Sequence, residues 1–480
     1  MGASNTPLRR AFWIAVIAAL APIGHGARAQ SVEDLQNMSI DQLANIDVSS
    51  VTKARESLSD APAAIYVITH DDIVRSGATS VPEILRLAPN LFVAQTSAST
   101  WVITARGFSG NAQAQNFSDK LLVLIDGRTV YSPLFSGVYW DMQDVLVEDI
   151  DRIEVISGPG ATLWGANAVN GVINIITRKS SETQGGLLEV GGGNLESEVS
   201  LRYGGKIGPD LTWRVYAKDF FDADTVTSTG APTHDNWSKP QGGFRFDWTP
   251  ASGDAVSVQG DAYQGYEAQQ GAANEDISGA DVLARWNHAW QNGATLQVQA
   301  YWDRTERSTQ DNGGGLLLNT FDLDLQNNFS LGARNSVVVG AGFRIDQYRI
   351  TNTSSLLFAP PDGHLDLANV FVQDSVSLAR SLTLILGVKL EDDPYSGLSP
   401  LPSVRLSWKP ADEVLLWAAV SRAIRSPTPF DTDVVEKIGP IVYLVGNPDF
   451  RPESLIAYEI GARAQPTPRL SFSVSTYYNA

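Results

Sequence analysis

A strict alternation of apolar and polar residues constrains this chain most, and it runs from about Gly185 to the end of the sequence. In one segment the apolar positions are Leu296, Val298, Ala300 and Trp302, and the polar positions are Thr295, Gln297, Gln299 and Asp303. A period of two residues places successive side chains on opposite faces of a β-strand. About fifteen such segments, each of roughly ten residues, follow one another between short turns. Residues 185–480 are therefore predicted to be all-β and antiparallel.

The length of these segments and their aromatic residues favour a membrane protein. A soluble β-sandwich or solenoid shows the same alternation, but a sandwich strand has only about 5–6 residues. Aromatic residues recur near segment ends, as the girdles of a transmembrane barrel require; the tryptophans are Trp213, Trp248, Trp286, Trp290, Trp408 and Trp417. Residues 185–480 are therefore predicted to belong to a transmembrane β-barrel, with the apolar face toward lipid and the polar face toward the lumen.

Residues 1–29 have the pattern of a secretory signal peptide. Arg9 and Arg10 precede an apolar run over residues 11–23, and Ala27-Arg28-Ala29 is a small-x-small cleavage signal. The run is too short for an uncleaved helical anchor, which needs about 20 apolar residues. No later apolar run reaches that length. A β-barrel is the other structure that can span a membrane.

Residues 57–180 are predicted to form a separate α+β domain. Short apolar or β-branched runs predict strands over residues 64–68, 101–105, 121–125, 153–156 and 172–176. A helix is expected to begin near His70 and end at Gly77, and Ser80 with Glu83 is expected to form the capping box of a second helix. The preceding residues 30–56 are polar and too few to fold alone.

The composition argues against several functions. The chain has 35 basic and 53 acidic residues, a net charge of −18, whereas a nucleic-acid-binding protein needs a basic face. It contains no cysteine, and its five histidines are scattered, so neither a disulfide framework nor a metal site is expected. The sequence has no Gly-x-Ser-x-Gly elbow and no catalytic constellation. We therefore expect neither an enzyme nor a bound cofactor.

Several motifs in the chain resemble those of TonB-dependent outer-membrane receptors. Residues 123–128 (VLIDGR), 150–160 (IDRIEVISGPG) and 163–177 (LWGANAVNGVINIIT) resemble the plug domain of that family, and Arg106-Gly107-Phe108 resembles its Arg-Gly-aromatic element. Residues 421–428, 446–453 and 458–461 resemble blocks of the family's barrel. These motifs follow the family order from about residue 47 to the end. One departure is Ser157, where many family members carry arginine before Gly-Pro.

The resemblance implies an α+β plug domain inside an antiparallel barrel of the bacterial outer membrane, and active import of a ligand. In this family the partner TonB grasps a periplasmic segment, the TonB box. The candidate TonB-binding residues here are Asp47, Val48, Ser49, Ser50, Val51 and Thr52. An alternating, β-branched segment can add as a strand to the edge of a partner's sheet. We expect residues 48–52 to be exposed and poorly ordered; the alternative is a plain linker.

The resemblance implies a scarce ligand, first of all a ferric siderophore, with cobalamin, haem or a carbohydrate as alternatives. A loop of residues 131–140 is rich in aromatic residues, which a merely solvated loop would not be. The candidate ligand contacts are Phe108, Asn111, Tyr131, Phe135, Tyr139 and Trp140. The competing interpretation is that these rings pack against the barrel.

A plug-to-barrel ion pair is the third expected feature. In the strand over residues 455–464, Tyr458 and Ile460 lie on the apolar face, so Glu459 faces the lumen. The family resemblance pairs this carboxylate with Arg106, with Glu453 as the second choice.

The sequence leaves two other functional classes open. A signalling receptor of this family carries an extra folded domain before the TonB box, which residues 31–56 cannot hold. A passive porin is disfavoured by a plug of this size. Family barrels have about 22 strands, and about fifteen are recognised here. We therefore expect an incomplete barrel, an open sheet with a gap between the strand near Leu187 and the strand near Phe472.

Overall fold

The computed structural model describes residues 46–53, 56–107, 118–311, 313–467 and 469–480. The chain divides into two units, residues 1–36 and residues 37–480, and all described residues belong to the second. The expected signal peptide over residues 1–29 lies outside the described residues. We call residues 46–56 the leader, residues 57–180 the plug, and the large sheet that follows the wall.

The plug is built on a five-stranded sheet in the order β3-β8-β9-β6-β7. Its strands are β3 (Ala64–Thr69), β8 (Ile150–Ser157), β9 (Gly171–Thr177), β6 (Leu121–Ile125) and β7 (Arg128–Thr129). The helices are α3 (His70–Ser76), α4 (Val81–Ile84) and α5 (Ala161–Trp164), with 3-10 turns η2 (Leu85–Leu87), η3 (Val147–Asp149) and η4 (Ser180–Glu182). Two small pairs complete this part: β1 (Asp47–Val48) with β2 (Glu56–Ser57), and β4 (Leu91–Gln95) with β5 (Trp101–Ala105). The predicted α+β plug is confirmed.

Local sequence explains the first helix of the plug but not the second. Helix α3 begins after Thr69, whose hydroxyl and the Asp72 carboxylate form a capping box, and it ends at Gly77 in the left-handed conformation. The expected capping box at Ser80 is wrong, because the Ser80 side chain makes no capping hydrogen bond to α4. The Glu83 carboxylate instead accepts from the Thr79 backbone N–H at 3.3 Å.

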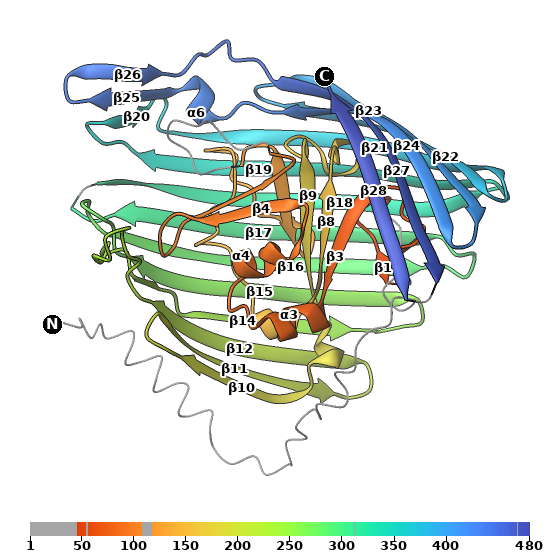
Figure 1. Cartoon of the computed structure of the whole chain (residues 1–480), viewed down its shortest axis with the longest axis horizontal. Coiled ribbons are helices and arrows are strands. Elements are labelled where there is room, and N and C mark those ends of the chain that lie inside the picture. The colour runs from red at the N-terminus through yellow and green to blue at the C-terminus, as the bar shows by residue number, and fades with distance from the viewer. Residues whose placement is uncertain (1–45, 54–55, 108–117, 312, 468) are drawn as a thin grey trace. The chain divides into compact units, whose positions relative to one another are not determined.

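The wall is an antiparallel sheet of sixteen strands among the described residues. They are β10 (Gly185–Gly192), β11 (Glu196–Ile207), β12 (Leu211–Asp222), β13 (Trp237–Ser238), β14 (Gln241–Trp248), β15 (Asp254–Glu267), β16 (Glu275–Ala289), β17 (Thr295–Thr309), β18 (Gly314–Leu331), β19 (Asn335–Thr351), β21 (Asp362–Ala379), β22 (Leu382–Asp393), β23 (Gly397–Ala411), β24 (Val414–Arg425), β27 (Glu453–Thr467) and β28 (Leu470–Asn479). Strands β13 and β14 share one position, since both pair with β12 and β15. Figure 1 shows the plug lying on the inner side of this sheet.

The two faces of the wall differ as the alternation predicts. In β18, Leu323 is 53% exposed on the outer face, whereas the neighbouring Asp322 is 7% exposed and points inward. In β27, Ile460 is 64% exposed and Glu459 is 7% exposed. A continuous outer face of exposed large apolar side chains is what a lipid environment requires. Within the described residues, no helix combines the length and apolar character of a helical membrane span.

The two ends of the wall carry connections of different length (Figure 1). One end, which we call the turn end, has short turns such as residues 208–210, 332–334 and 412–413. The other, the loop end, has longer connections such as residues 223–236, 352–361 and 426–452. The last two hold β20 (Leu356–Phe358), α6 (Pro429–Thr432), β25 (Val434–Ile438) and β26 (Ile441–Val445), and the three strands form a small sheet. In outer-membrane barrels short turns face the periplasm and long loops face outward.

Strands β10 and β28 are the two ends of the sheet order, and no pairing between them occurs among the described residues. Strand β10 pairs with β11, and β28 pairs with β27. The pairing of residues 187–192 with residues 470–478 that would close a ring is therefore not formed in the described part of the chain.

Candidate functional site

An ion pair between Arg106 and Glu459 joins the plug to the wall. Arg106 follows β5 and has a positive φ of 54°, which is unusual for a residue with a side chain. Its guanidinium donates to the Glu459 carboxylate and, at 3.1 Å, to the backbone carbonyl of Ser157. The ring of Tyr477 in β28 lies 3.9 Å from the guanidinium carbon. Both charged side chains are almost fully buried, at 5% and 7% exposure.

Gly158 makes this close approach possible. It has a φ of +102°, and a Cβ at this position would overlap the Glu459 carboxylate and crowd the Arg106 guanidinium. Gly158 therefore leaves room for the ion pair and also allows the turn after β8. At Ser157, where many relatives of this family carry arginine, the hydroxyl accepts from the Asn90 side chain at 2.6 Å.

The second-choice carboxylate, Glu453, belongs to a different cluster. It accepts from Arg425 at 2.6 Å and lies 3.1 Å from the Lys120 ammonium. Arg425 also lies 2.8 Å from Asp431 and 3.4 Å from Asp119. The structure thus brings Arg106 to Glu459 and leaves Glu453 to Arg425 and Lys120.

A row of ion pairs, which sequence reasoning missed, holds the opposite side of the plug to strands β11–β17. Asp149 lies between Arg202 and Arg214, and Asp144 lies between Lys218 and Lys239. Burial by itself would raise the pKa of Asp144, but the two ammonium groups outweigh burial, and its pKa lies below the ordinary value.

Two further pairs in this row have the opposite polarity, because Arg128 of the plug pairs with both Asp303 and Asp281 of the wall. The sequence did contain a sign of this row of ion pairs, namely charged residues at the inward-facing positions of strands with an apolar–polar alternation. The plug partners could not be matched to them without the fold.

The leader is buried, so the expectation that residues 48–52 are exposed is wrong. Val48 is 0% exposed and Val51 is 8% exposed, and both pack in an apolar cluster with plug residues such as Val172. Burying two β-branched side chains is favourable by roughly 1.5–3 kcal/mol each, which a free leader would forfeit. Asp47 alone in the predicted segment 47–52 is exposed.

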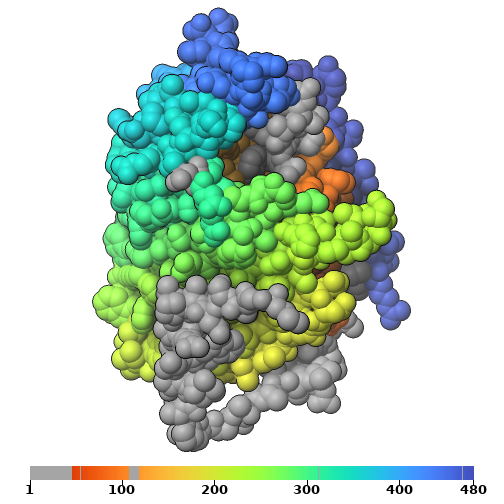
Figure 2. Space-filling view, turned by 90° about the vertical axis from the view of Figure 1, so that its left-hand side faces the viewer, coloured from red at the N-terminus to blue at the C-terminus, as the bar shows by residue number. Residues whose placement is uncertain are grey.

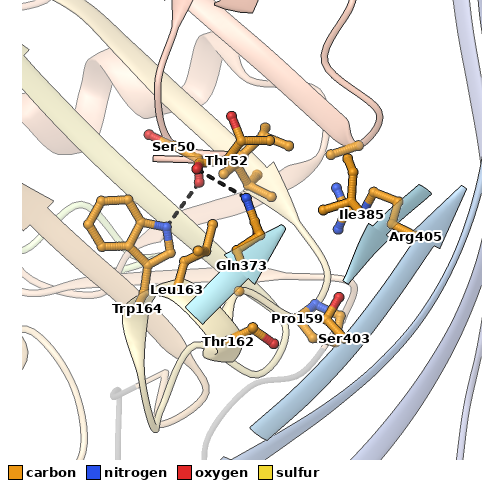
Figure 3. A pocket seen from close by; sticks show the side chains of 14 residues that line it. Ser50, Thr52, Pro159, Thr162, Leu163, Trp164, Gln373, Ile385, Ser403 and Arg405 are labelled. Atoms are coloured by element: carbon orange, nitrogen blue, oxygen red, sulfur yellow. Dashed lines mark hydrogen bonds between the residues drawn. The ribbon is translucent and has the colours of Figure 1, made fainter. Parts of the chain in front are cut away.

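Polar contacts also hold the leader in place. The backbone N–H groups of Ser49 and Ser50 donate to the Glu154 carboxylate at 3.2 and 3.0 Å. The Trp164 indole N–H donates to the Ser50 carbonyl at 3.0 Å, as Figure 3 shows. The candidate TonB-binding segment thus contacts both the plug core and the α5 tryptophan.

A small cavity of about 30 Å³ separates the leader from the wall (Figure 3). It is lined by Ser50 and Thr52 of the leader, Trp164 of the plug, and Gln373 and Arg405 of the wall. The Gln373 amide donates to the Thr52 carbonyl at 3.2 Å. A polar space of this size is large enough to hold a water molecule.

Two ionisable groups flank this buried segment. Burial raises the pKa of Glu56 from 4.5 to about 7, and the Thr52 hydroxyl donates to it at 2.9 Å. Burial lowers the pKa of Lys53 from 10.5 to about 8, and its ammonium lies 4.8 Å from the centre of the Trp164 ring.

We expect acidification from pH 7 to pH 5 to strengthen the docking of the leader. Between pH 4.5 and about 7, Glu56 is protonated in the docked leader but ionised in a released one. Docking is therefore strongest below pH 4.5 and weakens as the pH rises to about 7. The full span corresponds to about 3 kcal/mol. Lys53 titrates above this range and does not contribute. A spin label at Asp47 would report immobilisation at low pH, and Glu56→Gln should flatten the pH response; an unchanged response in that variant contradicts the assignment.

The aromatic loop of the plug is packed rather than open. Tyr131 and Trp140 are 7% and 8% exposed, and Trp140 belongs to the plug core. Phe135 and Tyr139 are half-buried; the Phe135 ring lies 5.6 Å from Phe358, and the Tyr139 ring lies 5.1 Å from the Arg307 guanidinium. Packing within the plug and leader therefore accounts for Tyr131 and Trp140, and packing against the wall accounts for Phe135 and Tyr139. Phe108 and Asn111 lie outside the described residues, as do residues 108–117 as a whole.

Two family models match the chain. "TonB dependent receptor-like, beta-barrel" matches residues 212–480, and "TonB-dependent Receptor Plug Domain" matches residues 57–172. The observed plug and the wall around it agree with these two family models. The chain belongs to the TonB-dependent receptor family.

Curated relatives of the chain are named either as vitamin B12 transporters or as enterobactin receptors. The vitamin B12 transporter of Vibrio cholerae is 30% identical over 205 residues, which cover 42% of this chain and 30% of that protein. The ferrienterobactin receptor of Escherichia coli is 23% identical over 86% of this chain and 67% of that protein. The match thus spans less than a third of the cobalamin transporter and two thirds of the enterobactin receptor.

Solved structures of the same fold include siderophore receptors. The receptor PirA of Acinetobacter baumannii superposes with a TM-score of 0.72 at 17% identity, over 88% of this chain and 71% of that one. The ferric enterobactin receptor of Pseudomonas aeruginosa in complex with enterobactin superposes with a TM-score of 0.67 at 15% identity, over 87% and 72%. At these identities the likeness establishes the fold.

Proposed function

We propose that this protein is an active importer of the bacterial outer membrane, which takes up a ferric siderophore with energy delivered by TonB. The observation that carries the proposal is the plug, held to the inner face of the wall by buried ion pairs such as Arg106 with Glu459. A ligand cannot pass until work displaces at least part of that plug. The names of the enterobactin receptors among the relatives support a siderophore as the ligand.

The leader is the proposed point where that work enters. It lies near the turn end, since the Lys53 carbonyl accepts from Gln326 at 2.8 Å and Asp60 just beyond it lies 2.5 Å from Lys409. The turn end faces the periplasm in barrels of this kind. We propose that residues 47–52 become available to TonB after release from their buried position, and then add as a strand to its sheet.

We expect uptake of radiolabelled iron carried by a siderophore to be lost in cells lacking TonB, while binding of the same complex at the cell surface persists. Binding needs only the loop end, which faces the outside of the cell, whereas import needs the plug to move. Uptake that continues at the normal rate without TonB would contradict energised import and favour a passive channel.

A second candidate is cobalamin, because the vitamin B12 transporters of Vibrio are 30% identical over their matched part. Competition separates the two ligands. An excess of unlabelled cyanocobalamin should leave iron uptake unchanged if the ligand is a siderophore, and labelled cyanocobalamin should enter only if cobalamin is the cargo.

A further inference from the structure

Two arginines of the wall bind backbone carbonyls of the plug instead of carboxylates. Arg405 in β23 donates to the Pro62 carbonyl at 2.7 Å. Arg463 in β27 donates to three more carbonyls, those of Leu58, Ala61 and Ala63. Among the described residues, neither guanidinium forms an ion pair. The plug segment over residues 58–63, which we call the cover segment, thus satisfies the hydrogen bonds of both arginines without neutralising them.

A third cation faces the same segment. Lys409 in β23 pairs with Asp60 at 2.5 Å, the one ion pair between the wall and the cover segment among the described residues. Glu459 lies in the same cross-strand row as the nearer arginine of β23, but its carboxylate is committed to Arg106. The three cations form what we call the cation patch, which consists of Arg405, Lys409 and Arg463.

Positive charge is not needed to hold the backbone in this part of the molecule. The wall binds the neighbouring leader carbonyls with neutral amides: Gln326 donates to Lys53 at 2.8 Å and Gln373 donates to Thr52 at 3.2 Å. A charged donor adds the cost of removing a cation from water, which neutral carbonyls offset only in part. The charge of the two arginines therefore points to a role beyond fixing the cover segment.

The cation patch lies toward the turn end of the wall. Lys409 comes shortly before the turn at residues 412–413, and Arg463 pairs across the strands with Leu415 just after it. Figure 2 looks onto the opposite end, the loop end, where the connection over residues 426–452 projects. Since the turn end faces the periplasm, the patch is separate from the surface that an incoming ligand meets first.

The cover segment is the part of the plug that a pull on the leader reaches first. It comes soon after residues 47–52, the proposed point of attachment of TonB, and before β3. Strand β3 is held in the plug sheet by a ladder of six residues with β8, whereas the cover segment has no strand pairing among its described residues. Arg405 also lines the small cavity beside the leader, as Figure 3 shows. Withdrawal of the leader and cover segment therefore uncovers the patch before the plug sheet has to break.

An uncovered patch presents only hydrogen-bond donors and positive charge. Arginine and lysine side chains carry no acceptor, and Asp60 departs with the cover segment. Guanidinium groups bind anionic oxygens in fork-like, charge-assisted pairs, and clusters of arginine or lysine select anions in membrane pores. A ligand with several negatively charged oxygens would replace the lost carbonyls and also neutralise the cations, which an uncharged ligand cannot do.

We propose that the cation patch is a second ligand site, on the periplasmic side of the plug, which takes a ferric chelate with anionic catecholate or carboxylate oxygens while the cover segment is withdrawn. The proposal rests on the TonB-driven siderophore import proposed above. In the resting protein the carbonyls of residues 58–63 occupy the donors that the chelate needs. The site is therefore closed until the leader has been pulled, and its return to the closed state expels the chelate.

The ion pair of Lys409 and Asp60 offers a matched pair of variants. Lys409→Gln and Asp60→Asn each break the same contact, and the two side chains are 33% and 44% exposed, so both proteins should fold. The probes are ferric enterobactin, an anionic catecholate, and ferric citrate, an anionic carboxylate, both labelled with radioactive iron. We expect Lys409→Gln to slow uptake by roughly threefold, and Asp60→Asn, which leaves all three cations in place, not to slow it. Equal losses in the two variants would mean that the pair only fixes the cover segment, and would overturn the proposal.

The two arginines give the larger effect. Arg405→Gln combined with Arg463→Gln should slow uptake of the anionic chelates by at least roughly tenfold, while their binding at the cell surface stays unchanged. Arg405→Lys combined with Arg463→Lys keeps both charges but loses the fork that reaches several carbonyls at once, and most of the uptake should return. Loss of uptake in the lysine variant as complete as in the glutamine variant contradicts a role for charge. The control Arg304→Gln with Arg349→Gln removes the same charge from exposed positions of the wall and should have no effect.

The choice of probe separates this inference from the function on which it rests. Ferrichrome, an uncharged hydroxamate chelate, serves as the third ligand. If the unmodified protein takes up ferrichrome and neither anionic chelate, the anionic site is overturned and siderophore import stands. If it takes up none of the three ferric chelates, siderophore import is itself overturned.

Discussion

Replacing Glu459 by alanine is expected to lower the free energy of unfolding by about 3–5 kcal/mol. The Arg106 guanidinium is 5% exposed, so the substitution leaves a buried charge without its carboxylate. Its backbone partner, the Ser157 carbonyl at 3.1 Å, offers only a partial negative charge in return. Urea unfolding of the purified protein, followed by tryptophan fluorescence, measures the loss.

The matched control for this variant is Glu306→Ala. Glu306 forms an ion pair with Arg304 at 2.8 Å, but their side chains are 43% and 38% exposed. Exposed pairs contribute about 0–1 kcal/mol, so this loss should be small. If Glu459→Ala unfolds within about 1 kcal/mol of the unmodified protein, the pair does not seat the plug. Glu459→Gln, which keeps a hydrogen-bond acceptor, should fall between the two.

Tethering the leader to the wall is expected to abolish import while leaving ligand binding intact. The Thr52 carbonyl and the Gln373 side chain are 3.2 Å apart, so cysteines at these two positions lie within reach of a short bifunctional reagent. The chain has no other cysteine that could react. A tethered leader cannot leave its buried position for TonB. Accumulation of labelled iron before and after reduction of a cleavable tether gives the measurement.

The control tether joins two wall strands near the same cavity. Ser403 and Ser421 are cross-strand partners whose hydroxyls lie 3.2 Å apart, and neither belongs to the leader. A cysteine pair there is exposed to the same reagent and should leave import unchanged. Import that persists with the leader tethered to Gln373 would show that residues 47–52 need not be released.

Sequence patterns were sufficient where the structure follows from local periodicity. The two-residue alternation identified the strands of the wall and which side of each strand faces inward, as at Glu459 and Ile460 in β27, because side-chain direction in a strand depends on position alone. Helix α3 was likewise recognisable, because its start near His70 and its stop at Gly77 are determined by residues at the helix ends.

Tertiary structure decided what depends on residues far apart in the chain. Residues 48–52 look like a free, polar leader, yet Val48 is buried, because a plug cluster and a wall strand more than 300 residues away close over the segment. The same reason hid the row of ion pairs: Asp149 and Arg202 are ordinary charged residues until the fold buries them together. Burial and charge pairing are properties of the assembled plug and wall, so no local pattern encodes them.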